Sequence, residues 1–500
     1  MVFSSYEFIF IFLPITLIIF YVLRKFNYIQ NAKLFLVLAS LFFYAFWKIE
    51  YVFILLLSMS VNFYLANLIL LNRGGVKLVF YSGIFFNLAL LVFFKYTDFL
   101  LENFNVFFQI TQLDFNIPLP HILLPLAISF FTFQQIAFLV DCYKRTNIEG
   151  LKSENTYKIN ILDYALFITF FPQLIAGPIV HHKEMMPQFK NLLQDSTVLI
   201  NWENIAKGLF IFSIGLFKKV YIADSFALWA NAGFKIVENG GALNILEAWV
   251  TSLSYTFQLY FDFSGYCDMA IGIALFFSIK LPINFNSPYK ALSITDFWRR
   301  WHITLGRFLK DYLYIPLGGN RISKVVSLRN LFIVAFVSGV WHGAGWGFIV
   351  WGVLHGIAMV FHKSYIFLIT NVKFKENITY KIFAWFITFN FINITWIFFR
   401  SENIQGAIKL LKAMFGVTWV ELPLKWHRMK ESLMQINGSN ETLFYIAICI
   451  ILCLGFKNSI ESLENFKPSY KNSLLVMFFL YVALITLSVV PYTEFIYFNF

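Results

Sequence analysis

The sequence predicts an all-α, polytopic membrane protein, and three observations support that fold class. The 500-residue chain is 59% hydrophobic and only 13% charged, with a mean hydropathy of +0.68, whereas soluble domains carry roughly twice that charged fraction. Apolar runs recur along the whole chain, and a run of about 17 to 25 residues is long enough to cross a bilayer. Lys and Arg gather in the short segments between the runs, as the positive-inside rule requires of cytoplasmic loops.

The apolar runs give the expected order of the membrane helices. Several runs are short or interrupted by Gly and Pro, so we expect about 11 to 13 transmembrane helices together with re-entrant and interfacial helices. We divide the chain into N-terminal transmembrane helices (1–120), a central core (121–366) and C-terminal transmembrane helices (367–500). The runs are 8–23, 33–47, 51–71, 78–96, 121–140, 205–223, 246–262, 328–342, 346–366, 381–399, 443–456 and 473–491.

Charges between the runs predict the orientation of the chain. Because basic loops stay in the cytoplasm, we expect a multi-pass protein of the bacterial inner membrane with an extracytoplasmic N-terminus. The first run lacks a basic segment before it and a cleavage site after it, so we expect a retained span and not a removed signal peptide. The charges are, in order along the chain, basic at Arg24, Lys25, Lys33, Arg73 and Lys77, acidic at Asp98, Glu102 and Asp114, and basic again at Lys144, Arg145, Lys152 and Lys158.

Composition and motifs exclude several other classes of protein. The net charge of +12 is spread over loops and forms no soluble basic face, which argues against nucleic-acid binding. The cysteines at 142, 267, 449 and 453 lack the spacing of a metal or disulfide framework. The sequence contains no nucleophile elbow, phosphate-binding loop or zinc-protease motif. We therefore expect no metal site.

Residues 161–189 combine about seventeen apolar residues with Pro172, Gly177 and Pro178. Irregular backbone at membrane depth is tolerated only where it is buried in protein or lines a wet cavity. We therefore expect a bent or re-entrant element. His181 and His182 follow it, and we interpret them as a tandem pair at the surface.

Residues 253–312 hold more polar side chains than a plain transmembrane helix tolerates. Intramembrane carboxylates normally face a cavity or pair with a cation. Two interpretations stay open: structural salt bridges that join helices, or the lining of a substrate path. Charged and aromatic residues recur at helical spacing over 296–314, which predicts a helix along the cytoplasmic interface. The polar residues are Gln258, Asp262 and Asp268, and the cations that follow them are Arg299, Arg300, Arg307 and Lys310.

Three histidines are candidates for chemistry, because imidazole takes and returns protons near neutral pH. His302 lies in the cationic, amphipathic stretch, whereas His342 and His355 each precede the second glycine of a GxxxG pair. That spacing lets helices approach closely, so a packed hydrogen bond between helices is the alternative role for both. One continuous helix would point these two imidazoles about 220° apart. The intervening GAGWG predicts a break in the helix.

Several long motifs occur in one order and together resemble the membrane-bound O-acyltransferase (MBOAT) family, in particular its AlgI-like and PatA-like branch that O-acetylates bacterial polysaccharides. The resemblance implies a ring of helices around a central tunnel, with the catalytic histidine at His342 and a second functional histidine at His302. Candidates to contact substrate or line the tunnel are Gln258, Asp262, Asp268, Arg299, Arg300, Trp341 and His355. The motifs are PLAISFFTFQQIAFLVDCYK at 125–144, FPQLIAGPIV at 171–180, QLYFDFSGYCDMAIGIA at 258–274, LPINFNSPYKALSITDFWRRWHITLGRFLKDYLYIPLGGNR at 281–321, VSGVWHGAGWGFIVWGVLHG at 337–356 and WIFFR at 396–400.

The resemblance also implies a reaction. We expect acyl transfer from acetyl-CoA, or another acyl-CoA or acyl carrier, on the cytoplasmic side, with no permanently bound cofactor. His342 would act as general base and His302 would orient the acceptor or relay a proton. Arg299 and Arg300 would attract the CoA phosphates, since guanidinium suits phosphate, or anchor the chain at the membrane surface.

The expected acceptor is peptidoglycan, followed by alginate or another exopolysaccharide. It would be reached through a separate extracytoplasmic acetyltransferase of the SGNH type or like AlgJ, AlgX or PatB. Two alternatives of another class are a transporter that passes acyl groups without bond chemistry and a scaffold for the secreted transferase. The block 253–356 has no second copy in the sequence, which counts against a transporter built from inverted repeats.

Overall fold

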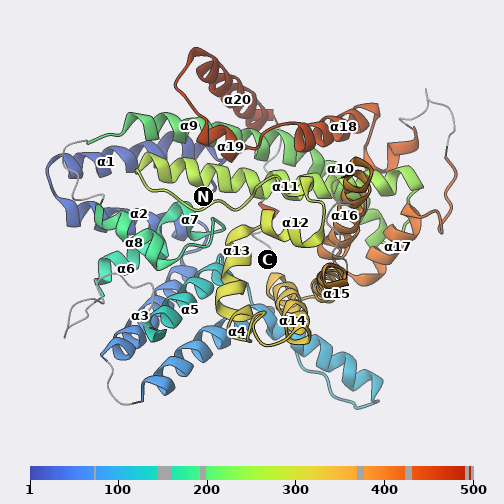
Figure 1. The fold of residues 1–500 in the computed structure, drawn as a ribbon, viewed down its shortest axis with the longest axis horizontal. Coiled ribbons are helices and arrows are strands. Elements are labelled where there is room, and N and C mark those ends of the chain that lie inside the picture. The colour runs from blue at the N-terminus through green and yellow to red at the C-terminus, as the bar shows by residue number, and fades with distance from the viewer. Residues whose placement is uncertain are drawn as a thin grey trace. The chain divides into compact units, whose positions relative to one another are not determined.

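A computed structural model describes residues 1–71, 75–144, 159–191, 199–368, 377–422, 431–489 and 495–496. All regular structure in these ranges is helical, which confirms the predicted all-α class (Figure 1). Each predicted apolar run falls on a helix, although the run at 121–140 is helical only from Ile128. Of the charges used for the orientation, Arg73, Arg145, Lys152 and Lys158 lie outside the described residues.

The chain forms two compact units. Unit 1 comprises Met1–Phe212 with Met269–Pro282, and unit 2 comprises Ser213–Asp268 with Ile283–Phe500. The division falls within two helices, α9 and α11, so each of them contributes residues to both units. The division of the sequence into three segments stays a prediction.

Unit 1 packs helices around a cluster of phenylalanine rings. The Phe43 ring centroid lies 5.7 Å from that of Phe8 and 5.6 Å from that of Phe171. A buried ion pair between Lys33 and Asp163 joins α2 to α6. The elements of this unit are a π-helical turn η1 (Glu7–Phe12), α1 (Leu13–Lys25), α2 (Ile29–Ala45), α3 (Glu50–Leu70), α4 (Val76–Ile110), α5 (Ile128–Lys144), α6 (Ile161–Thr169), α7 (Phe171–Leu174), α8 (His182–Asn191) and most of α9 (Trp202–Phe217).

The bent element predicted at 161–189 is confirmed. Helix α6 ends at Thr169, α7 spans a single turn, and the chain is not helical again until His182. The surface position predicted for His181 and His182 is wrong, since the two residues are only 3% and 6% exposed. The Pro and Gly turn folds the chain back into unit 1, where the His182 ring centroid lies 5.1 Å from that of Phe138.

Unit 2 contains every residue predicted to take part in catalysis or to line the tunnel. Its long helices are joined by short helical turns that carry much of the polar sequence. The elements are a π-helical turn η2 (Lys218–Ala223), α10 (Asp224–Glu238), most of α11 (Ile245–Phe276), η3 (Pro288–Lys290), α12 (Ile294–Arg300), α13 (Ile303–Leu309), η4 (Lys310–Tyr314), α14 (Lys324–His342), α15 (Trp346–Leu368), α16 (Ile378–Arg400), α17 (Ile404–Met414), η7 (Glu431–Ile436), α18 (Asn440–Gly455), α19 (Ser459–Glu464) and α20 (Tyr470–Val489).

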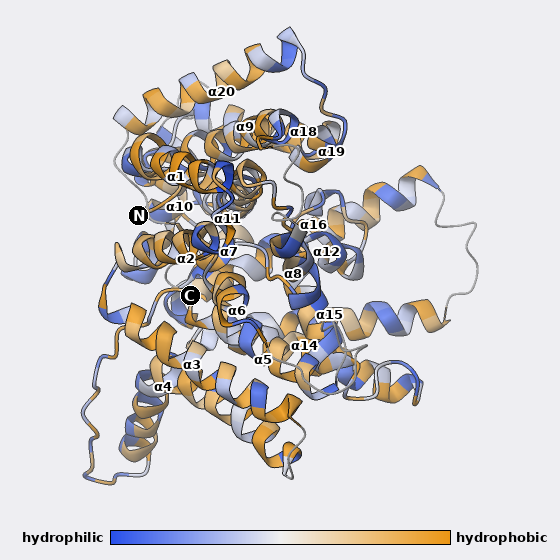
Figure 2. Cartoon of the chain, turned by 90° about the vertical axis from the view of Figure 1, so that its left-hand side faces the viewer, coloured by the Kyte–Doolittle hydropathy of each residue, from blue (hydrophilic) through white to orange (hydrophobic). Residues whose placement is uncertain are grey.

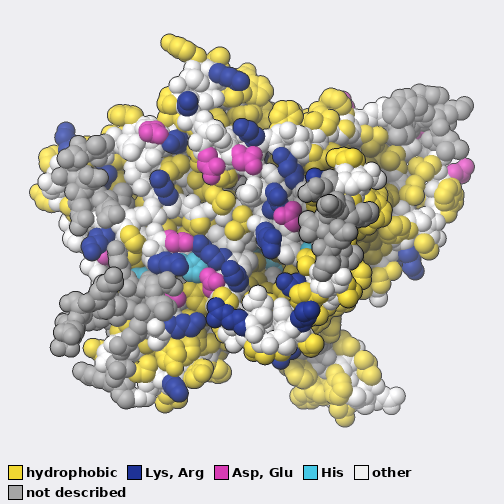
Figure 3. Space-filling view, in the orientation of Figure 1, with side chains coloured by type: hydrophobic (Ala, Val, Ile, Leu, Met, Phe, Trp, Pro, Cys, Tyr) yellow, Lys and Arg dark blue, Asp and Glu magenta, His cyan; other side chains and the backbone are white. Residues whose placement is uncertain are grey.

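Eight helices of the described chain are long and apolar enough to cross a membrane. Hydrophobic residues extend along them (Figure 2), and hydrophobic side chains are exposed on the surface beside Lys and Arg (Figure 3). These features identify a multi-pass membrane protein, whereas the ring, the tunnel and a total of about 11 to 13 spans stay predictions. The eight are η1 with α1, α3, α4, α11, α14, α15, α16 and α20, of which α11 has its apolar window wholly buried.

The break predicted at GAGWG is confirmed, because α14 ends at His342 and α15 begins at Trp346. The two helices pack at the predicted glycines. A Cβ added to Gly339 would lie 2.7 Å from the Gly352 Cα and 2.6 Å from the Phe348 carbonyl oxygen, so only glycine allows this approach. The close packing places His342, at the end of α14, directly beside α15.

Candidate active site

His302 lies where the expected continuous helix over 296–314 is broken. It separates α12 from α13 and adopts the left-handed conformation, with φ 45° and ψ 52°. Such a backbone costs a non-glycine residue about 1–3 kcal/mol and persists only where the surroundings hold it. The interfacial helix predicted here is therefore two short helices, and the residue between them is completely buried.

Asn284 supplies the polar contacts that hold this turn. Its side-chain Oδ1 accepts hydrogen bonds from the Thr304 backbone N–H at 3.2 Å and from the Thr304 hydroxyl at 2.8 Å. The His302 Nδ1 lies 3.2 Å from the same oxygen. His302 is outside the spanning helices, and burial lowers its pKa to about 3. The imidazole is therefore neutral at physiological pH.

His342 lies among aromatic rings. Its ring centroid is 5.2 Å from that of Trp351, 5.1 Å from that of Phe399 and 4.9 Å from that of Trp341. The Trp341 ring also contacts His302, with 6.4 Å between centroids. The structure thus brings the two histidines predicted to be functional into contact with one indole.

His355 forms hydrogen bonds to two other helices. The Trp298 Nε1–H on α12 donates to His355 Nδ1 at 3.2 Å, and His355 Nε2 lies 3.0 Å from the Thr395 hydroxyl on α16. Because an indole N–H can only donate, Nδ1 accepts and the proton of the neutral ring is on Nε2. This arrangement favours the packing role that the sequence left open for His355.

The two carboxylates of α11 pair with lysines of η2 and not with the cations between Arg299 and Lys310. The Lys218 Nζ lies 2.7 Å from Asp268 Oδ2, and the Lys219 Nζ lies 2.8 Å from both Asp262 Oδ1 and Asp224 Oδ1. Asp262 also accepts a hydrogen bond from the Ile496 backbone N–H at 2.9 Å. Of the two interpretations, these contacts support structural salt bridges that join helices.

The remaining candidates do not gather around the histidines. Gln258 is buried on α11. Arg300 is held by the protein, with its Nε 2.9 Å from Asp296 Oδ1 and its Nη1 donating to the Asn286 carbonyl oxygen at 3.3 Å. Arg299 is exposed, whereas Arg300 is only partly exposed and bound to Asp296.

The sequence analysis missed Asn284, Lys218 and Lys219. The lysine pair had a signal, because two adjacent charges interrupt the apolar run 205–223 and buried charges need partners. Asn284 had none, since an asparagine in a short segment between two prolines, Pro282 and Pro288, is typical of an ordinary turn.

Comparison with known proteins places these residues in a family. Residues 110–401 match the membrane-bound O-acyltransferase family. The peptidoglycan O-acetyltransferase of Helicobacter pylori is 47% identical over 100% of this chain and 98% of its own length. A probable alginate O-acetylase AlgI of Pseudomonas aeruginosa is 37% identical over 84% of this chain and 76% of its own.

A more distant relative matches a smaller part of the chain. The teichoic acid D-alanyltransferase of Bacillus subtilis is 28% identical over 55% of this chain and 68% of its own. The family match covers His302, His342 and Asn284 alike. This protein belongs to the membrane-bound O-acyltransferase family.

Proposed function

We propose that this membrane O-acyltransferase carries out the O-acetylation of peptidoglycan, with acetyl-CoA as the donor on the cytoplasmic side. The observation that carries the proposal is the pair of buried imidazoles, His302 and His342, in contact with Trp341. It is supported by the full-length similarity to a peptidoglycan O-acetyltransferase. The charges of the loops support an inner-membrane protein with an extracytoplasmic N-terminus.

His342 acts as the general base. Its imidazole removes the proton from an acceptor hydroxyl while that oxygen attacks the carbonyl carbon of the acetyl thioester. A tetrahedral intermediate forms, the carbon–sulfur bond breaks, and the CoA thiolate takes the proton back from the imidazolium. A general base contributes about 10²–10⁴-fold to the rate. The aromatic rings around His342 exclude water, which strengthens electrostatic effects on the reacting atoms.

Three further roles belong to the proposal. His302 binds the acceptor hydroxyl or relays its proton. Arg299, which is exposed, attracts the phosphates of CoA, whereas Arg300 is occupied by Asp296. A separate extracytoplasmic acetyltransferase of the SGNH type completes delivery to the glycan.

The test uses membranes of the native cell, which contain the protein together with the extracytoplasmic acetyltransferase, with radiolabelled acetyl-CoA and the cell's own peptidoglycan. Wild type is compared with His342→Ala and His302→Ala at matched amounts of folded protein. We expect label in the glycan with wild type and a loss of transfer in both variants. Undiminished transfer by His342→Ala would remove this residue as the base and favour a conduit or a scaffold without bond chemistry.

Alginate or another exopolysaccharide is the second candidate acceptor. The 37% identity to a probable alginate O-acetylase favours this alternative. The same membranes are offered alginate and peptidoglycan in parallel. Label that enters alginate and not peptidoglycan would change the acceptor while leaving the acyl-transfer chemistry intact.

A further inference from the structure

We infer that Asn284 is a positioning residue that fixes the tautomer of His302, so that Nδ1 carries the proton and Nε2 presents a lone pair to the substrate. The inference rests on the proposed function, because it concerns how His302 takes part in acyl transfer. It selects between two chemically different states of a buried neutral ring, one that accepts a hydrogen bond at Nε2 and one that donates from it.

The hydrogen bonds of Thr304 settle how the Asn284 amide is oriented. A backbone N–H can only donate, so the amide atom 3.2 Å from the Thr304 nitrogen is oxygen and not nitrogen. The other end of the amide agrees, since Nδ2 faces the Cys267 Sγ, a weak acceptor, at 3.5 Å. The orientation therefore follows from contacts that do not involve His302.

The tautomer of His302 follows from that orientation. Its Nδ1 lies 3.2 Å from the Asn284 Oδ1, and a carbonyl oxygen has no proton to give. Nδ1 must therefore donate, and in a neutral imidazole the lone pair is then on Nε2. The Phe263 ring packs against the imidazole with 4.9 Å between centroids and 85° between planes, which restrains rotation of the ring.

Backbone hydrogen bonds hold the Asn284 segment beside the histidine turn. The Ile303 N–H donates to the Asn284 carbonyl oxygen at 3.0 Å, and the Asn286 N–H donates to the Arg300 carbonyl oxygen at 2.9 Å. These two bonds lie on either side of His302. The accepting oxygen and the ring that donates to it are therefore fixed in one local frame.

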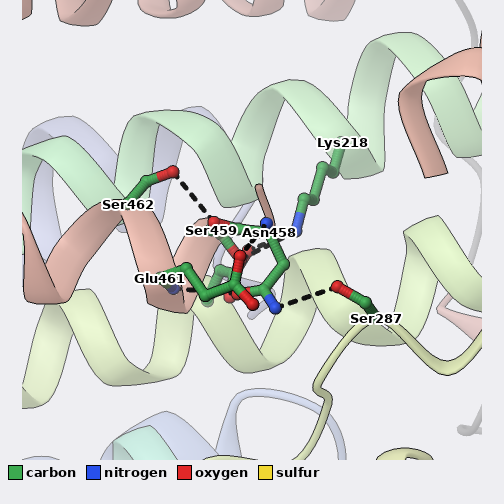
Figure 4. A network of polar contacts seen from close by, with 7 residues as sticks. Lys218, Ser287, Asn458, Ser459, Glu461 and Ser462 are labelled. Carbon is green, nitrogen blue, oxygen red and sulfur yellow. Dashed lines mark hydrogen bonds and ion pairs between the residues drawn. The ribbon is translucent and has the colours of Figure 1, made fainter. Parts of the chain in front are cut away.

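A second anchor comes from the residue that caps α19. The Asn458 Nδ2 lies 3.0 Å from the Asn286 Oδ1. The same nitrogen lies 3.0 Å from the Ser287 Oγ (Figure 4). Its Oδ1 accepts from the Glu461 backbone N–H at 2.8 Å, so this asparagine is itself held at the start of a helix. The segment 284–287 is thus supported on both sides, as a positioning element requires.

The fixed tautomer determines what His302 does in the reaction. Nε2 accepts the hydrogen bond of the acceptor hydroxyl or, in a relay, its proton, which passes on to His342 and from there to the CoA thiolate as the carbon–sulfur bond breaks. When Nε2 is protonated, the Nδ1–H···Oδ1 bond becomes charge-assisted and roughly twice as strong. Asn284 thereby stabilises the imidazolium without touching the substrate.

The test measures kcat/KM for acetyl transfer between pH 5 and 9 in wild type, Asn284→Asp and Asn284→Ala. Asn284→Asp keeps an acceptor oxygen for Nδ1, so we expect transfer to continue. Its carboxylate raises the pKa of His302 by about 1–3 units from about 3, so we expect kcat/KM of this variant to fall toward pH 5 relative to wild type. Asn284→Ala frees the tautomer, and we expect kcat to fall by at least about 10-fold, with about 10⁴-fold as the upper bound set by wrong tautomers in serine proteases.

Asn393→Asp is the matched control. Asn393 is also completely buried in unit 2, where its Oδ1 accepts from the Ser252 hydroxyl at 3.0 Å and from the Thr256 hydroxyl at 2.7 Å. The Asn393→Asp variant also buries a carboxylate, as Asn284→Asp does, but residue 393 does not contact His302. We expect its stability to change and its pH profile to superimpose on that of wild type. Equal shifts in the two aspartate variants, or wild-type kcat in Asn284→Ala, would overturn the inference.

A measurement on the unaltered protein is independent of whether the variants fold. Imidazole ¹⁵N chemical shifts distinguish protonated from unprotonated nitrogens, and His302→Ala identifies the His302 resonances by their loss. We expect a protonated Nδ1; a protonated Nε2 would refute the proposed tautomer. Loss of transfer in wild type, or full transfer by His302→Ala, would instead count against the proposed function.

Discussion

Two polar groups of side chains are buried in unit 2, and they are built in opposite ways. We call the first the charge cluster, formed by Lys218, Lys219, Asp224, Asp262 and Asp268. We call the second the imidazole cluster, formed by His302, His342 and His355 with Trp298, Trp341 and Trp351. In the charge cluster each ammonium lies within 2.8 Å of a carboxylate. In the imidazole cluster the contacts described above are aromatic rings, an amide and a hydroxyl.

The difference separates residues that hold the fold from residues that can react. A buried ion pair is satisfied by its partner, and changing the protonation of either member leaves a charge uncompensated. Imidazole is the side chain that takes up and releases a proton near neutral pH, and in this cluster the Trp351 and Phe399 rings pack against that of His342. Chemistry is therefore expected at the imidazole cluster, and stability is expected to depend on the charge cluster.

The largest effect on activity is expected from His342→Gln. Glutamine has a similar size and cannot take the acceptor proton, so we expect acetyl transfer to fall about 10²–10⁴-fold. The yield of folded protein and its melting temperature in detergent should stay close to wild type. A variant that unfolds in parallel with its loss of activity would show that His342 belongs with the residues that hold the fold.

Lys218→Met is expected to have the largest effect on stability. It leaves the Asp268 carboxylate, which is 5% exposed, without its ammonium, and breaking a buried pair costs about 3–5 kcal/mol. The measurement is the unfolding free energy in detergent, with specific activity determined per folded molecule. Adding Asp268→Asn should restore most of the stability, and the comparison fails if Lys218→Met folds normally yet transfers no acetyl group.

Local patterns in the sequence predicted the framework of the imidazole cluster. The GAGWG break and the packing of Gly339 against Gly352 follow from spacing within about twenty residues, where helix periodicity decides which side chains share a face. The all-α class follows from hydrophobic runs that need no tertiary information. These predictions succeeded because each depended on one segment of chain.

The partners of polar residues were not predictable in the same way. Asp268 pairs with a lysine fifty residues earlier in the chain, and Asn284 is separated from His302 in the sequence by η3 and α12. His181 and His182 are buried because the turn after Pro172 directs the chain inward, which composition does not reveal. Where a contact joins distant segments, one sequence offers the residue types but not the pairing.

His355→Phe is expected to have a moderate effect that sharpens the comparison inside the imidazole cluster. Phenylalanine keeps a ring but removes both nitrogens, so the Trp298 N–H loses its acceptor at His355, while the Thr395 hydroxyl keeps its hydrogen bond to the Ile392 carbonyl oxygen at 2.9 Å. Leaving buried polar groups unsatisfied costs about 1–3 kcal/mol of stability. We expect a smaller loss of kcat than in His342→Gln. The coupling energy between Trp298 and His355 is measured by comparing Trp298→Phe, His355→Phe and the double variant. Additive losses of stability would show that the hydrogen bond between these two side chains contributes nothing.

The smallest effect concerns the dependence of stability on pH. The unfolded chain protonates His302 near pH 6.5, whereas the folded protein, in which burial lowers the pKa to about 3, does not. Stability contributed by the neutral ring is therefore fully present above pH 6.5 and falls by about 1.4 kcal/mol per pH unit below it. His302→Gln lacks this dependence, so between pH 7 and pH 5 the unfolding free energy of wild type should drop relative to the variant by about 2 kcal/mol. If the difference in unfolding free energy between wild type and His302→Gln stayed constant across that range, His302 would take up its proton at the same pH in the folded and the unfolded chain. The neutral ring would then contribute no pH-dependent stability.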